Sequence, residues 1–144
     1  MLGVLFNLFL GPRYGRRVVN WVSPGMIFLA FCVAFAAFVQ LPDGGALVDT
    51  VYPWIYSGVL HVDIALRVDP LSGVMIMVIT GVGFLIHVYS VGYMAHDEDV
   101  VRYFTYLNLF TTAMLLLVLG DNILLLFVGW EGVGLCSYLL IGFW

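Results

Sequence analysis

The sequence has very few charged residues and no lysine at all. Only 10% of its 144 residues are charged, whereas a typical soluble domain has about 25%. All five basic residues are arginines, and nine acidic residues give a net charge of −4. This balance excludes the basic surface typical of nucleic-acid binding, so no nucleic-acid partner is expected. With 63% hydrophobic residues and a mean hydropathy of +1.08, the chain is predicted to be an integral membrane protein.

Cysteine is also scarce. Cys32 and Cys136 both lie within apolar segments, which argues against a structural disulfide in a loop facing an oxidising compartment. We expect both to behave as small buried hydrophobic residues. The sequence has no Cys/His spacing of a metal site, no glycine-rich phosphate loop and no nucleophile–base pair. It therefore predicts no metal-binding and no cofactor-binding residues in this chain.

Long apolar segments, separated by short polar stretches, make up most of the chain. They predict a single membrane domain over residues 1–144, an all-α integral membrane helix bundle with about five transmembrane helices. The helices are expected at residues 1–10, 18–41, 70–94, 103–119 and 122–144. The first is about 15 Å long and cannot cross a hydrocarbon core of about 30 Å, so it is partial and is expected to end at Gly11-Pro12. Residues 41–45, with the sequence LPDGG, form a predicted loop after the second helix.

Three of the five arginines fall between the first two helices. Arg13, Arg16 and Arg17 are predicted to lie in one short loop, which the positive-inside rule places on the cytoplasmic or matrix side. The acidic composition, rich in glycine, alanine and valine and without lysine, favours a bacterial plasma membrane over a mitochondrial inner membrane.

A small β-hairpin is predicted at residues 52–69, between the second and third helices. The segment HVDIALRVD (residues 61–69) alternates apolar and polar side chains, as a half-buried strand does, and Ser57-Gly58 supplies a turn. The hairpin would lie on the side of the membrane opposite the arginine loop. Because an isolated hairpin is only marginally stable in water, we expect it to rest on another part of the chain.

The last predicted helix carries one ionisable side chain, Glu131. At 1.5 Å per residue it lies about 14 Å along this helix, near the middle of the hydrocarbon core. A carboxylate at that depth costs about 2.5 kcal/mol or more on insertion scales, so it should face protein groups or water and not lipid. Gly129, Gly132 and Gly134 surround it, which would let other helices approach and leave room for water. The pattern indicates a functional proton-transfer residue, with a purely structural, protonated glutamate as the alternative.

His87, toward the cytoplasmic end of the third predicted helix, is a second candidate. It would either hydrogen-bond a backbone carbonyl or headgroup water, or take part in a proton path. If the chain handles a substrate, that substrate is a proton or a small cation. Asp121 or Asn122 is expected to cap the N-terminus of the last helix.

Four segments carry a resemblance to a known family. They are GWEGVGLCSYLLIGFW (residues 129–144), DPLSGVMIMVITGVGFLIHVYSVGYM (residues 69–94), RYFTYLNLF (residues 102–110) and LGDN (residues 119–122). They resemble the largest antiporter-like membrane subunit of proton-pumping NADH:quinone oxidoreductase, or respiratory complex I. That subunit is called subunit L in bacteria and subunit 5 in mitochondria. The first half of the chain resembles it in layout, including the hairpin.

The resemblance implies that this chain is the N-terminal part of a membrane-arm subunit and that Glu131 is the essential glutamate of a proton half-channel. In that family the glutamate is paired with a lysine on a later helix, expected beyond Trp144. It also implies other membrane-arm subunits, protons and the lipid bilayer as partners. NADH, FMN, iron–sulfur clusters and quinone are expected in partner subunits.

Two other functions remain open at this point. The first is the large subunit of a multisubunit sodium/proton antiporter, which shares the same helix plan. The second is a structural membrane subunit or fragment without transport of its own, in which Glu131 only strengthens helix packing.

Overall fold

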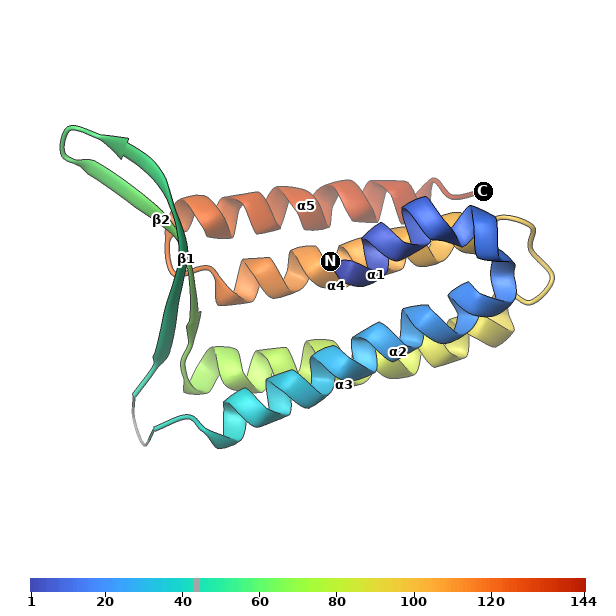
Figure 1. Cartoon of the computed structure of the whole chain (residues 1–144), viewed down its shortest axis with the longest axis horizontal. Coiled ribbons are helices and arrows are strands. Elements are labelled where there is room, and N and C mark those ends of the chain that lie inside the picture. The colour runs from blue at the N-terminus through green and yellow to red at the C-terminus, as the bar shows by residue number, and fades with distance from the viewer. Residues whose placement is uncertain (43–44) are drawn as a thin grey trace.

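Long helices run side by side along the molecule, and a β-hairpin crosses one end of them (Figure 1). This arrangement is a computed structural model, which describes residues 1–42 and 45–144. In chain order the elements are α1 (Leu2–Leu5), the π-helix η1 (Phe6–Leu10), α2 (Gly11–Val39), β1 (Leu47–Ser57), β2 (Leu60–Val68), α3 (Pro70–Tyr93), α4 (Val100–Leu119) and α5 (Ile123–Ile141). Asp43 and Gly44 of the predicted loop lie outside the described residues.

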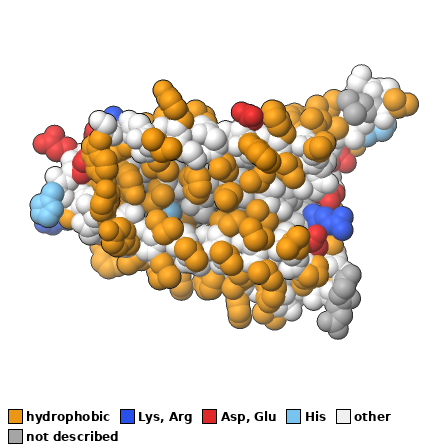
Figure 2. All heavy atoms as spheres, turned by 180° about the vertical axis from the view of Figure 1, so that it is seen from behind, with side chains coloured by type: hydrophobic (Ala, Val, Ile, Leu, Met, Phe, Trp, Pro, Cys, Tyr) orange, Lys and Arg blue, Asp and Glu red, His pale blue; other side chains and the backbone are white. Residues whose placement is uncertain are grey.

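The helices are long and apolar enough for a membrane protein. Among the residues that the structure describes, four segments qualify by length and composition, namely residues 2–39, which contain the turn at Gly15 described below, 70–93, 100–119 and 123–141. Apolar side chains cover most of the face seen in Figure 2, whereas charged side chains gather mainly at its two ends. The chain is therefore an integral membrane protein, and the predicted helix bundle with a small β-hairpin between the second and third helices is confirmed.

The first two helices meet at a different residue from the one predicted. The chain stays helical through Gly11 and Pro12, and it turns back at Gly15, whose φ of 77° and ψ of 175° are not helical. Pro12 is tolerated because it lies in the first turn of α2, directly after the π-helix, where a missing N–H matters least. The arginines therefore flank a one-residue turn and do not form the predicted loop. Residues 2–14 form the short first helix, as expected for a partial helix, and residues 16–39 the long second one.

The hairpin lies across the turn between α4 and α5, so the expectation that it rests on another part of the chain is confirmed. The backbone N–H of Asp121 donates to the carbonyl of Ala65 at 3.0 Å, and the side chain of Asn122 donates to the carbonyl of Asp63 at 2.7 Å. Arg67 adds an ion pair to Asp121 at 3.6 Å. These contacts attach β2 to the bundle, so β1 and β2 are not a free two-stranded ribbon.

The hairpin is longer than predicted, and its turn falls one residue later. The two-residue turn is Gly58-Val59, and Gly58 has a φ of 59°, a conformation that glycine adopts without strain. Strict alternation along β2 also fails, because Val62 and Ala65 are both buried. The pairing of β1 with β2 also contains two register shifts, and both of the extra residues, Val51 and Trp54, belong to β1.

Helix α3 begins with a reciprocal cap. The carboxylate of Asp69 accepts a hydrogen bond from the backbone N–H of Ser72, and the Ser72 hydroxyl accepts one from the N–H of Asp69, each at 2.8 Å. The backbone N–H of Ser72, and after it the Ser72 hydroxyl, hold the pKa of the Asp69 carboxyl below its ordinary value. Pro70 follows at the first helical position, which needs no backbone donor. The predicted start of this helix is confirmed.

The end of the molecule that contains Arg13, Arg16 and Arg17 is called the arginine end below. Here α5 stops at Ile141, three residues earlier than predicted, because the chain turns so that Phe143 packs into the core. The indole N–H of Trp144 donates to the carboxylate of Asp97 at 2.9 Å. A hydrogen bond from the backbone N–H of Asp99, and then the bond from Trp144, lower the pKa of Asp97.

Candidate functional site

Helix α5 carries the predicted site and is capped by Asn122. The Asn122 side chain accepts a hydrogen bond from the backbone N–H of Leu125 at 2.9 Å, so one of the two expected caps is confirmed. At 1.5 Å per residue, Glu131 lies about 12 Å along the helix axis from the start of α5 at Ile123 and about 15 Å from its end at Ile141. Its carboxylate therefore lies close to the middle of a helix long enough to cross a membrane.

One face of α5 packs very closely against α4 through two glycines. A Cβ atom placed on Gly129 would lie 2.5 Å from the backbone nitrogen of Leu117, and one on Gly132 would lie 3.0 Å from the Cβ of Ala113. Cys136 lies on the same side and is fully buried, as predicted. The same expectation for Cys32 is wrong, because its side chain on α2 is exposed. The prediction that small residues let a neighbouring helix approach is confirmed, but these two glycines face α4 and do not make room around Glu131.

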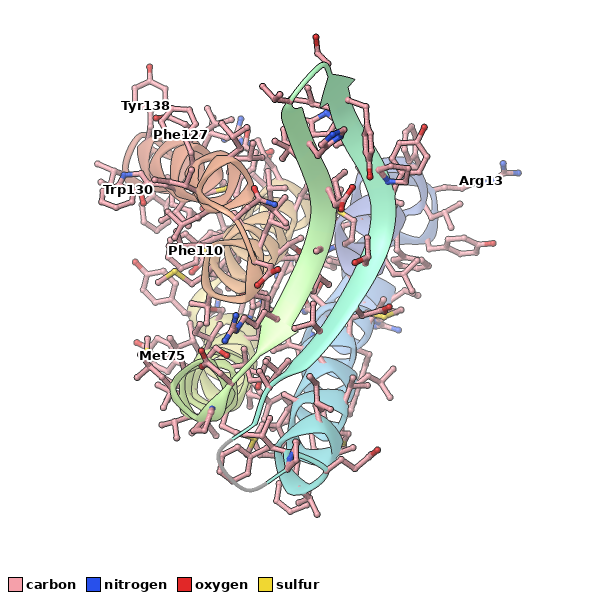
Figure 3. All side chains as sticks on the ribbon, turned by 90° about the vertical axis from the view of Figure 1, so that its left-hand side faces the viewer. Arg13, Met75, Phe110, Phe127, Trp130 and Tyr138 are labelled. Atoms are coloured by element: carbon pink, nitrogen blue, oxygen red, sulfur yellow. The ribbon has the colours of Figure 1, made fainter. Side chains whose placement is uncertain are left out.

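Glu131 lies on the opposite face of α5, which the rest of this chain leaves open. At about 100° per residue it is about 200° around the helix axis from Gly129. Its neighbours on the outward side are large, and Figure 3 shows three of them, Phe127, Trp130 and Tyr138, pointing away from the bundle. Glu131 is exposed and makes no hydrogen bond or ion pair with any residue that the structure describes.

His87 occupies a different environment, between α3 and α4. It is 1% exposed, and its Nδ1 lies 2.7 Å from the carbonyl oxygen of Gly83. Because a carbonyl can only accept, Nδ1 must carry the hydrogen, which leaves the Nε2 lone pair available in the neutral ring. Nε2 is buried without a partner in the described part of the chain. The expectation of a bond from His87 to a backbone carbonyl is confirmed.

The two candidate residues do not form one site in this chain. Helix α4 lies between α3 and α5 (Figure 1), and Glu131 points away from α4 while His87 packs against Phe104 of α4 at a ring distance of 6.1 Å. A pocket of about 210 Å³ beside His87 is lined mainly by apolar side chains of α3 and α4, with the hydroxyl of Thr111 among them. Any proton path through both residues needs groups beyond those described.

A set of buried polar side chains was not predicted from the sequence. Asn7 donates to the hydroxyl of Ser23 at 2.8 Å, joining the first helix to α2, and Asn108 donates to the carbonyl of Phe104 at 2.9 Å. Ser90 and Tyr103 lie 3.3 Å apart between α3 and α4. Asn7 and Asn108 are single amides within apolar runs, and this is the sequence signal that would have identified them as buried polar groups in need of partners.

The fold and these residues define a class. The chain is a polytopic α-helical membrane protein with one carboxylate near the middle of a membrane-length helix. Within residues 1–42 and 45–144, no group of three or more His, Cys, Asp and Glu side chains is placed to hold a metal ion. What Glu131 can do at its position is bind and release a proton, or a small cation, if a polar environment reaches it.

Comparison with known proteins gives the family. Residues 54–104 match the family model described as NADH-Ubiquinone oxidoreductase (complex I), chain 5 N-terminus. NADH-quinone oxidoreductase subunit L of Mycobacterium tuberculosis is 61% identical over 99 residues, which are 69% of this chain and 16% of that protein. The subunit L proteins of Pseudomonas aeruginosa and Rhodobacter capsulatus are 43% and 44% identical over the whole chain and over 24% and 21% of their own lengths.

The chain belongs to the subunit L family of NADH-quinone oxidoreductase and corresponds to its N-terminal part. It spans between about a sixth and a quarter of the length of these curated relatives. The resemblance read from residues 129–144 and the other segments is thereby confirmed, and the sodium/proton antiporter alternative is not favoured.

Proposed function

We propose that this chain forms the N-terminal part of a membrane-arm subunit of a proton-translocating NADH:quinone oxidoreductase. Glu131 takes up a proton from one side of the membrane and releases it toward the other, driven by redox chemistry in partner subunits. The observation that supports this role best is the position of Glu131, a carboxylate near the middle of a membrane-length helix that makes no described contact of its own.

The energy of burial supports a proton-binding role for Glu131. An isolated carboxylate in hydrocarbon costs about 2.5 kcal/mol or more, and the protonated form avoids most of that cost. No described residue packs over the carboxylate to hold it in either state. We therefore propose that further helices or subunits cover this face, bring water to it, and supply a cation whose approach lowers its proton affinity.

The partners follow from the same proposal. The other membrane-arm subunits contact this chain, the lipid bilayer surrounds it, and protons are the transported species. NADH, FMN, iron–sulfur clusters and quinone are held by partner subunits. The arginine end faces the bacterial cytoplasm, because four of the five arginines lie there and only Arg67 lies near the hairpin.

We propose a lesser role for His87 in the same pathway. Its Nδ1–H is committed to Gly83, so only the Nε2 lone pair is available to receive a proton. Water entering the pocket between α3 and α4, beside the hydroxyl of Thr111, would connect this nitrogen to other groups. This role depends on such water, because the described residues offer Nε2 no partner.

The test is proton pumping by the complete complex with Glu131→Gln, which keeps the shape of the side chain but cannot carry a proton. We expect the number of protons moved per NADH oxidised to fall clearly in Glu131→Gln and to be largely retained in Glu131→Asp. Glu98→Gln, the same chemical change in the exposed loop between α3 and α4, is the matched control and should pump normally. Normal pumping by Glu131→Gln would contradict the proposal, and a loss of assembly with normal turnover would support a structural role instead.

A further inference from the structure

A groove of about 590 Å³ lies between α2 and α3. Its volume is within the range of about 300–1,000 Å³ that small-molecule sites occupy. The residues that line it are Arg17, Asn20, Trp21, Pro24, Gly25, Phe28, Phe84, Val88 and Val91. The groove is thus cationic at one end and apolar along the rest of its length, and neither Glu131 nor His87 takes part in it.

The depth of the groove matches one leaflet of a bilayer. From Arg17 to Phe28 the α2 wall rises about 16 Å at 1.5 Å per residue, which is about half of a 30 Å hydrocarbon core. Trp21 lies near the charged end and is 84% exposed, a position typical of aromatic residues at the membrane interface. An occupant of this groove therefore has a polar group at the interface and an apolar tail that reaches about the middle of the membrane.

The three arginines near the Gly15 turn have different environments, and only one of them serves the groove. Arg16 donates to the backbone carbonyls of Met94 and Ala95, so it fastens this turn to the end of α3. Arg13 points away from the helices (Figure 3). Arg17 makes no described hydrogen bond or ion pair, and it lines the groove. Its guanidinium is available for an anion.

Two features of α2 keep the groove open and polar near its rim. A Cβ atom on Gly25 would meet nothing within 4 Å, so the absence of a side chain there adds to the open space. Oδ1 of Asn20, one turn deeper than Arg17, is buried without a hydrogen-bond partner in the described part of the chain. It provides an acceptor for a hydroxyl group or water that accompanies a headgroup.

We propose that this groove binds one anionic phospholipid, with its phosphate on Arg17 and an acyl chain between α2 and α3 along Phe28, Phe84 and Val88. Arginine binds the phosphate through two parallel hydrogen bonds. The positive charge at the rim favours a headgroup with net negative charge, because a zwitterionic headgroup would bring its own cation close to Arg17. The apolar walls of the groove hold the lipid's acyl chain more specifically than the surrounding fluid lipid does, because these walls are formed by fixed aromatic and branched side chains. The site is independent of the proposed proton transfer and does not require it.

The test is photo-crosslinking of the intact complex in nanodiscs that contain phosphatidylglycerol with a diazirine in its acyl chain. We expect labelled peptides to include residues 17–28 and the part of α3 that faces them. Arg17→Ala should lower this labelling by about fivefold to tenfold, as expected for loss of one arginine–phosphate contact near a membrane surface. Arg17→Lys should retain much of it.

Arg13→Ala is the matched control, because it removes the same charge from the same turn but not from the groove. Gly25→Leu should lower the labelling without any change of charge, since its side chain would occupy the open space. Equal labelling in wild type, Arg17→Ala and Arg13→Ala would overturn the proposal, as would equal labelling by a phosphatidylcholine probe. The absence of labelled residues 17–28 in the wild type would show that a protein segment covers the groove. If Gly25→Leu does not assemble, the Arg17→Ala and Arg13→Ala comparison decides alone.

Discussion

The close approach of α4 and α5 at Gly129 allows one substitution to be predicted with a magnitude. In Gly129→Ala the new methyl carbon would lie 2.5 Å from the backbone nitrogen and 2.6 Å from the Cα of Leu117. These are main-chain atoms in the middle of a helix, so no side chain can rotate to relieve the contact. An ordinary contact between such atoms is about 3.5–4.0 Å, and the helices must therefore separate by about 1 Å.

The cost of that separation can be estimated. Overpacking of a closely packed interior costs about 1–3 kcal/mol, and here it also loosens the neighbouring contact of Gly132 with Ala113. Replacing glycine by alanine within a helix contributes a stabilisation of up to about 1 kcal/mol in the opposite direction. We expect a net destabilisation of about 1–2 kcal/mol for Gly129→Ala.

Gly134→Ala is the matched control, since it makes the same chemical change five residues along the same helix. A Cβ atom there would meet nothing within 4 Å, so this variant should be neutral or slightly more stable. Both variants are to be measured in the intact complex by thermal unfolding in detergent, with disulfide crosslinking between α4 and α5 as a direct measure of their separation. If Gly129→Ala matches Gly134→Ala in stability and in crosslinking, the close packing described for α4 and α5 is wrong.

Two further predictions concern the ends of the helices. Asp69→Ala removes the capping carboxylate of α3 and should lower the free energy of unfolding by about 0.5–2 kcal/mol, measured by titration with SDS; an unchanged midpoint would contradict the cap. The hydrogen bond from Trp144 to Asp97 should persist at pH values above the ordinary pKa of a carboxyl group. It should be lost as the pH falls through the lowered pKa of Asp97, because the carboxylate that accepts the bond is then protonated. The difference in fluorescence between wild type and Trp144→Phe measures it, and a transition centred above the ordinary aspartate pKa of about 3.9 would refute the assignment.

Hydrophobic segments and capping residues predicted most of the architecture. The run from Pro70 to Tyr93 is bounded by Asp69 and is long and apolar enough to specify a membrane helix without reference to its neighbours. The hairpin followed from alternation along residues 61–69, although its register depends on bulges. Length, polarity and local caps are properties of single segments, which explains why they can be read from the sequence.

The errors arose where two segments meet. Gly11-Pro12 looked like a helix end, but the π-helix before it lets the chain stay helical to Gly15. Gly129 and Gly132 looked like surroundings of Glu131, but the side of α5 that packs on α4 was not specified by a nearly uniform apolar sequence. Asn7 became a partner of Ser23 only through the tertiary contact of two helices. Each of these depends on packing between elements, which local pattern does not encode.

The two faces of α5 separate the stability of this chain from its proposed activity. The Gly129 face makes its contacts within the chain, so changes there should alter the position of α5 and hence the free energy of unfolding. The Glu131 face makes no described contact, so Glu131→Gln removes no interaction that holds these helices together. A loss of pumping in Glu131→Gln without loss of stability would therefore be a direct effect on proton transfer. The partner that lowers the proton affinity of Glu131 is then to be sought among the groups that cover this outward face.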